Sequence, residues 1–190
     1  RRGSEFDLTT HCDVVVDKDD ELDEILTTIE RSPQAALAAV LLLRGVENRT
    51  IEESLIAEST TYSLLQGGAE FAQWKNHRVS RESKVAGEAE VLSERLDDHL
   101  MVTLNSPARR NAFSSNMRTA LAEILQVALI DESIQSVTLR GAGSNFSSGG
   151  DLDEFGSFTD PISTHISRLT SNVAVSLNML RERLGTKLCC

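Results

Sequence analysis

The stretch SVTLRGAGSNFSSGGDLDEFG, residues 136–156, joins a short apolar run to a segment unusually rich in glycine and serine. Residues 137–139 are typical of a buried strand, and glycines follow directly at positions 141 and 143 and again at 149 and 150. A strand, a glycine-rich turn and then a helix can direct backbone N–H groups at an anion, because the first amides of a helix have no acceptor within the helix. Glycine also lets a ligand approach the main chain closely.

The residues alone allow two interpretations of this stretch: a dinucleotide-binding turn, or a connection that binds no ligand. Gly141 and Gly143 supply the first two glycines of a dinucleotide-binding fingerprint, but Phe146 occupies the place of the third. The second reading is a tight connection between a strand and a helix that binds no ligand.

A third reading comes from a family resemblance. The order L-x-G-x-G-x-x-F-S-x-G-G-D-L over residues 139–152 resembles the signature of the crotonase (enoyl-CoA hydratase/isomerase) superfamily. Residues 102–125, VTLNSPARRNAFSSNMRTALAEIL, are similar to the first strand, the loop and the first long helix of that fold, and residues 130–143 are similar to the stretch leading into the second strand. The resemblance implies an α/β fold, a partial crotonase-like ββα spiral.

The resemblance also implies a site. In crotonases two backbone N–H groups bind the carbonyl oxygen of an acyl-CoA thioester, and the position of the first matches Ser148. Donors fixed where negative charge develops are each worth about 10²–10³ in rate. Gly149 and Gly150 would let the thioester pass close to the main chain. Asp151 is expected in the first turn of the following helix, in a structural rather than a catalytic role.

The loop PARRNAF, residues 107–113, resembles the family segment that lines the coenzyme A site. Ala112 matches a backbone position that meets the ligand, and Arg109 or Arg110 is suited to the phosphates; two solvated loop arginines are the alternative. Expected substrate contacts are therefore Arg110, Ala112, Gly149, Gly150 and Asp151. The coenzyme A thioester is the substrate, and no cofactor or metal is expected.

Residues 19–78 are expected to be helical. Helical spacing covers 19–31, Pro33 opens a largely apolar helix that should be buried, and Thr50 and Glu53 fit a capping box. We expect four parts along the chain: vector-derived residues at 1–6, a helical module at 7–78, a linker at 79–90, and the N-terminal portion of a crotonase-like domain at 91–190.

Within that portion, residues 91–105 predict a β-hairpin around Asp97-Asp98-His99. Ser114 or Ser115 should begin a long amphipathic helix. A single last helix is expected from about 161 to 184, closed by Gly185. The final residues, TKLCC, look like the start of a strand with no partner or continuation.

Composition narrows the classes of function. The net charge of −10 argues against nucleic-acid binding, and no apolar run is long enough for a membrane span. The three cysteines include no CxxC pair, which fits a reducing, cytoplasmic environment.

The functional hypothesis is an acyl-CoA enzyme of the hydratase/isomerase type that stabilises a thioester enolate. The chain is expected to be incomplete for catalysis, because no residue matches the family's acid and base carboxylates. The N-terminal helices resemble the arrangement in cofactor-independent arylacetyl-CoA dioxygenases, which is one alternative; a non-catalytic binding or assembly protein is another. The expected partners are acyl-CoA and either copies of the same chain, in the trimers usual for the family, or a separate C-terminal half.

Overall fold

The computed structural model describes residues 12–16, 19–78, 89–157, 160–170 and 172–190. Two compact units divide the chain, Arg1–Gln73 and Trp74–Cys190. The expected vector-derived residues 1–6 and most of the expected linker, 79–88, lie outside the described residues, and the predicted domain boundaries stay predictions. No helix in the described part of the chain is both long and apolar enough to cross a bilayer.

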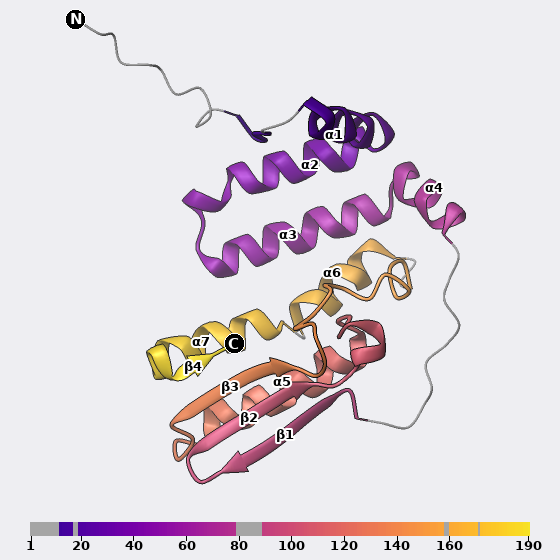
Figure 1. The fold of residues 1–190 in the computed structure, drawn as a ribbon. Helices are drawn as coiled ribbons and strands as arrows, with labels where there is room; N and C mark the ends of the chain where they lie inside the picture. The colour runs from indigo at the N-terminus through magenta and orange to yellow at the C-terminus, as the bar shows by residue number, and fades with distance from the viewer. Residues whose placement is uncertain (1–11, 17–18, 79–88, 158–159, 171) are drawn as a thin grey trace, which may run out of the picture. The chain divides into compact units, whose positions relative to one another are not determined.

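Helices make up the first unit (Figure 1). They are α1 (Asp19–Arg31), α2 (Pro33–Arg44), α3 (Ile51–Gln66) and the start of α4 (Ala69–His77). The predicted capping box is confirmed: Thr50 Oγ1 accepts the N–H of Glu53 at 3.2 Å, and Glu53 Oε2 accepts the N–H of Thr50 at 2.8 Å. A carboxylate from α4 caps α2, because Glu70 accepts the N–H groups of Gln34 and Ala35.

The prediction that α2 is buried is wrong. None of its residues is buried, and Leu37, Leu41 and Leu43 are 57–68 % exposed. Within its unit α2 packs against α1 and α3, and one layer of helices covers only part of a helix that is apolar nearly all round.

The second unit is built on a four-stranded sheet in the order β1-β2-β3-β4. Strands β1 (Val91–Leu96) and β2 (His99–Leu104) form the predicted antiparallel hairpin, and Asp97 turns it with φ 54°. Helix α5 (Ser115–Ile130) then leads to β3 (Ser136–Gly141), which lies parallel to β2. The predicted start of α5 is confirmed, because Ser114 Oγ accepts the N–H of Met117 at 3.0 Å.

The core lies between one face of this sheet and two helices, α5 and α7 (Val173–Leu184) (Figure 1). Alternate residues of β2 and β3 face the helices because side chains on a strand point to opposite faces in turn. The buried apolar residues are Val91, Leu100, Val102, Leu104, Met117, Leu121, Leu125, Ala128, Ile134, Val137, Leu139, Val173 and Leu180.

Two further expectations for the C-terminal part are corrected. The single helix expected over 161–184 is two helices, α6 (Pro161–Thr170) and α7, because Asn172 caps the second one by accepting the N–H of Ala174 at 3.0 Å. The predicted last strand exists as β4 (Leu188–Cys189), and it does have a partner, since it pairs in parallel with β3. Gly185 ends α7 with φ 58°, as predicted.

Candidate functional site

Two loops meet at the carboxyl ends of β2 and β3, and the buried side chain of Asn111 joins them. Its Oδ1 accepts the N–H of Ser106 at 2.8 Å, and its Nδ2 donates to the carbonyl oxygens of Ala142 and Asn145 at 3.0 and 2.7 Å. The backbone at Asn111 is left-handed, with φ 53°, which asparagine tolerates better than most residues. Loop 105–114 and loop 142–151 are therefore fixed to each other through one amide side chain.

Close packing at this junction makes Gly141 obligatory. A Cβ there would overlap the carbonyl oxygen of Asn145 and would lie 2.5 Å from that of Phe146 and 2.7 Å from Asn111 Nδ2. Main-chain oxygens cannot turn aside as a flexible side chain can, so the loop itself would have to move.

Hydrogen bonds on both sides of Ser148 hold this segment to loop 105–114. Ser147 Oγ donates to the carbonyl oxygen of Asn111 at 2.8 Å and accepts the N–H of Gly149 at 3.2 Å. An isolated parallel bridge follows, in which the Phe113 N–H donates to the Gly149 carbonyl at 2.8 Å. The Asp151 N–H donates to the Phe113 carbonyl at 3.1 Å and completes the bridge.

Between these fixed points lies the N–H of Ser148. Among the described residues this N–H donates no hydrogen bond, and Ser148, Gly149 and Gly150 are all exposed. Gly149 adopts φ 89° and has open space where a Cβ would be, whereas a Cβ on Gly150 would lie 3.0 Å from the ring of Phe155. The geometry therefore presents an unused backbone donor next to Gly149, which leaves open space, while Gly150 lies against the Phe155 ring.

Asp151 lies outside any helix, which corrects one expectation. The next helix, α6, begins at Pro161, so Asp151 is not in its first turn. Its carboxylate is buried and accepts a hydrogen bond from Arg109 Nη2 at 2.6 Å. Its Oδ1 also accepts the N–H of Asp153 at 3.1 Å. Through these contacts the Asp151 carboxylate stabilises the loop.

The two candidate arginines differ in their surroundings. Arg109 bonds to Asp151 and also to Asp153, at 2.7 Å, so its charge is already neutralised within the protein. Arg110 is exposed, has φ 54°, and makes no ion pair within the described part of the chain. Ala112 is half-buried, and its N–H donates to the Arg109 carbonyl at 3.1 Å.

Asp153 lies between two guanidinium groups, Arg78 at 2.8 Å and Arg109 at 2.7 Å. The hydrogen bond from Arg78, followed by that from Arg109, holds the pKa of Asp153 below its usual 3.8 against the opposing effect of burial. The next residue, Glu154, accepts hydrogen bonds from the N–H and hydroxyl of Ser115 at 2.6 and 2.7 Å, where the start of α5 favours a negative charge.

The lowered pKa of Asp153 predicts a dependence of stability on pH. A carboxyl group whose pKa is lower in the folded than in the unfolded chain stabilises the fold above the unfolded value, about 3.9, and this stabilisation is lost as pH falls through the folded value. Asp153→Asn should therefore lower the free energy of unfolding at pH 7, and the deficit relative to the unsubstituted chain should shrink below about pH 4. Urea unfolding between about pH 2 and 7 measures this.

The control for that measurement is Glu123→Gln. Glu123 is an exposed acid of α5 without an ion pair in the described part of the chain, so its replacement should change stability by less than about 0.5 kcal/mol at every pH. A deficit for Asp153→Asn that is the same at pH 2 and pH 7 would contradict the assignment.

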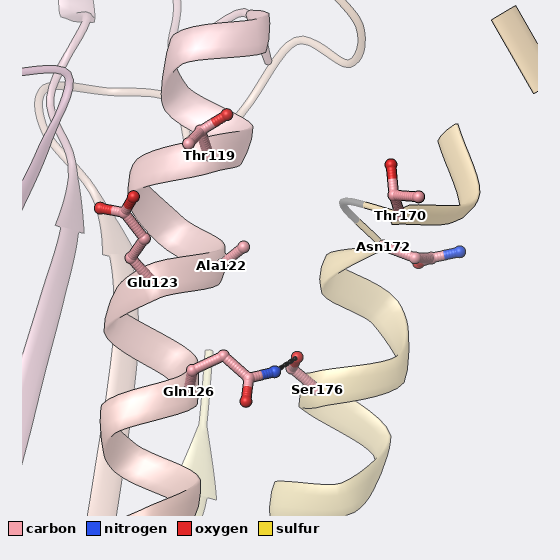
Figure 2. Close-up of a pocket in the computed structure, with 7 residues that line it drawn as sticks. All are labelled: Thr119, Ala122, Glu123, Gln126, Thr170, Asn172 and Ser176. Atoms are coloured by element: carbon pink, nitrogen blue, oxygen red, sulfur yellow. Dashed lines mark hydrogen bonds between the residues drawn. The ribbon is translucent and has the colours of Figure 1, made fainter. Parts of the chain in front are cut away.

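A separate groove of about 380 Å³ lies between α5 and the α6–α7 junction (Figure 2). Gln126 reaches across it and donates to Ser176 Oγ at 3.3 Å. No residue predicted for the thioester site lines it; the lining residues are Thr119, Ala122, Glu123, Gln126, Thr170, Asn172 and Ser176.

The sequence interpretation missed Asn111, Ser147 and the ion pairs of Arg109. The sequence does offer a signal for Asn111, because an asparagine in a turn tolerates a left-handed backbone. Nothing in the sequence indicates which carboxylates the arginines meet.

Comparison with known proteins agrees with the resemblance over this region. Residues 99–165 match the family model described as enoyl-CoA hydratase/isomerase. The chain is 36 % identical over 76 residues to "Probable enoyl-CoA hydratase EchA14" of Mycobacterium tuberculosis, covering 39 % of this chain and 30 % of that protein. It is 40 % identical over 55 residues to the 1,2-epoxyphenylacetyl-CoA isomerase of Escherichia coli, covering 29 % and 21 %.

Solved structures give the same partial coverage. A carnitinyl-CoA hydratase from Mycobacterium avium matches at 28 % identity with a TM-score of 0.36, covering 37 % of this chain and 28 % of that one. The chain thus spans about 30 % of the length of the first relatives. Residues 99–165, about a third of the chain, are therefore similar to the crotonase (enoyl-CoA hydratase/isomerase) superfamily, and helices precede them in the sequence.

Proposed function

We propose that the crotonase region binds an acyl-CoA thioester and that the backbone N–H of Ser148 donates to its carbonyl oxygen. The single observation that carries the proposal is that this N–H lies on an exposed loop and donates to no group of the described chain. The residues on either side are fixed by Ser147 Oγ and by the Phe113–Gly150 bridge. A donor held in place by its neighbours is oriented before the ligand arrives.

The chemistry that such a donor supports is enolate formation. When a proton leaves the carbon next to the thioester carbonyl, the electron pair of the C–H bond moves toward oxygen, and negative charge grows there. A hydrogen bond at that oxygen is therefore stronger in the transition state than in the ground state, and one such donor is worth about 10²–10³ in rate. The family resemblance assigns no residue of this chain as the acid or the base, so hydration or isomerisation requires groups beyond those identified.

The other site residues receive narrower roles in the proposal. Gly149 leaves room for the thioester, Gly150 brings its main chain close to the ligand without a side chain of its own, and Ala112 offers its backbone to the ligand. Arg110 is preferred to Arg109 for the phosphates of coenzyme A, because Arg109 is committed to two carboxylates. Asp151 holds Arg109 and the loop rather than the substrate.

Isothermal calorimetry with two probes tests the proposal on the chain as it exists. Acetyl-CoA carries the thioester carbonyl, and S-ethyl-CoA is the matching thioether without that oxygen. One hydrogen bond contributes about 1 kcal/mol, so acetyl-CoA should bind about five- to tenfold more tightly. Equal affinity, or no heat from either probe with a folded sample, would overturn the proposal.

The proposal includes an assembly and a location. They are a homo-oligomer or a pairing with a separate C-terminal half, and a cytoplasmic location. Sedimentation of the purified chain distinguishes an oligomer from a monomer.

A further inference from the structure

The 74–78 segment belongs to the second unit. Its side chains contact the loop that follows Gly150. Lys75 Nζ donates to the carbonyl oxygen of Gly156 at 2.8 Å, and Arg78 Nη2 donates to Asp153 Oδ1 at 2.8 Å. The Trp74 ring lies 6.4 Å from the Phe155 ring, centroid to centroid. Three side chains from one turn thus reach a single short loop, residues 153–156.

A series of ion pairs connects Arg78 to Asp151, three residues after Ser148. Arg78 bonds to Asp153, Asp153 bonds to Arg109, and Arg109 bonds to Asp151, with successive distances of 2.8, 2.7 and 2.6 Å. Two arginines balance two carboxylates in this chain of contacts. Without Arg78, a single guanidinium would face two carboxylates whose mutual repulsion favours their separation.

An aromatic route runs in parallel. Trp74 packs against Phe155, and the Phe155 ring lies so near Gly150 that a Cβ there would approach it to 3.0 Å. The Arg78 guanidinium stacks over Trp74, 5.3 Å from the ring centroid, a favourable cation–π arrangement. Both routes end at residues 150–151, directly after the backbone that carries the Ser148 N–H.

We infer that Trp74 and Arg78 are positioning residues that hold loop 149–156 in place and thereby keep the Ser148 N–H aimed at the thioester oxygen. The inference deepens the proposed function and rests on it. Residues 152–156 form turns and bends rather than a helix or strand. Their backbone hydrogen bonds are local to the loop, so side-chain contacts, including the Glu154–Ser115 bonds, hold the loop against the rest of the unit. The 74–78 segment therefore supports the thioester site without itself contacting the ligand.

The test compares Arg78→Gln with Arg78→Lys and with a matched control, Arg44→Gln. Arg44 also makes a short ion pair, 2.6 Å to Asp13, which lies in the first unit and is more exposed than the pair of Arg78 with Asp153. Hydrogen exchange of the Gly149 and Asp151 amides should quicken about tenfold or more in Arg78→Gln. Arg78→Lys should recover part of the protection, and Arg44→Gln should leave exchange unchanged. The midpoint of thermal unfolding checks that each variant is folded.

A ligand measurement separates positioning from general stabilisation. Arg78→Gln should reduce the five- to tenfold preference for acetyl-CoA over S-ethyl-CoA to about twofold or less, and the affinity for S-ethyl-CoA should stay within about twofold. Trp74→Phe is the second variant, because it keeps an aromatic ring beside Phe155, and it should retain most of the preference. Trp74 is the single tryptophan of the chain, so its fluorescence should shift in Arg78→Gln and report the loss of the contact directly.

The two proposals fail in different ways. If the unsubstituted chain shows no preference for acetyl-CoA, the proposed function is wrong and the positioning role falls with it. If the unsubstituted chain shows the preference and Arg78→Gln keeps it, or if amide exchange is unchanged, only the positioning role is overturned.

Discussion

Replacing Asn111 by alanine is expected to lower the free energy of unfolding by about 3–5 kcal/mol, because it removes a buried side chain and three hydrogen bonds and leaves partly buried backbone groups without partners. The side chain is fully buried and makes three hydrogen bonds, to Ser106, Ala142 and Asn145. Each buried group that loses its partner costs about 1–3 kcal/mol, and alanine is also less tolerant of the left-handed backbone at this position. Urea unfolding followed by circular dichroism measures the loss.

Two further variants make this result specific. Asn111→Asp keeps an acceptor for the Ser106 N–H but loses both donated bonds, so it should also destabilise. Asn116→Ala is the control, since Asn116 is exposed on α5 and its replacement should cost less than about 0.5 kcal/mol. If Asn111→Ala and Asn116→Ala were equally stable, Asn111 would not be the residue that joins the two loops.

Ser148→Pro is expected to abolish the preference for acetyl-CoA over S-ethyl-CoA, whereas Ser148→Ala should keep it. Proline has no backbone N–H, and alanine removes only the hydroxyl. That hydroxyl lies 3.5 Å from the Arg109 carbonyl, at the limit of a hydrogen bond, so its loss should matter little. Calorimetry with the two probes measures both variants.

A backbone ester gives the cleaner form of this experiment. Replacing Ser148 by lactic acid converts the amide to an ester, which removes the N–H without the ring of proline, and it should abolish the preference as Ser148→Pro does. Similar losses from Ser148→Ala and from the ester would indicate a role for the hydroxyl and would contradict the backbone assignment.

The local features of this protein were predictable because their signals are local. The capping box at Thr50 and Glu53, the hairpin turn at Asp97 and the start of α5 at Ser114 each depend on residues within a few positions. The break before α7 was also signalled locally by Asn172, but the apolar spacing on either side of it continued and predicted one helix.

The errors arose where distant parts of the chain decide the outcome. The apolar composition of α2 predicted burial, but burial depends on what packs around a helix, and its neighbours cover it only in part. A helix commonly follows a strand and a glycine-rich turn, and this pattern predicts a helical position for Asp151. Its position is set instead by Arg109, 42 residues away in the sequence.

The sequence by itself determined most of the helices and strands and the order of glycines that resembles the crotonase signature, since backbone preference and hydrophobic spacing act within one segment. Only the tertiary structure decided that Asn111 joins two loops and that the Ser148 N–H is left without an acceptor among the described residues. It alone also connected Arg78, Asp153, Arg109 and Asp151. Hydrogen bonds and ion pairs between distant segments depend on where the packed core places them, and no local pattern encodes that placement.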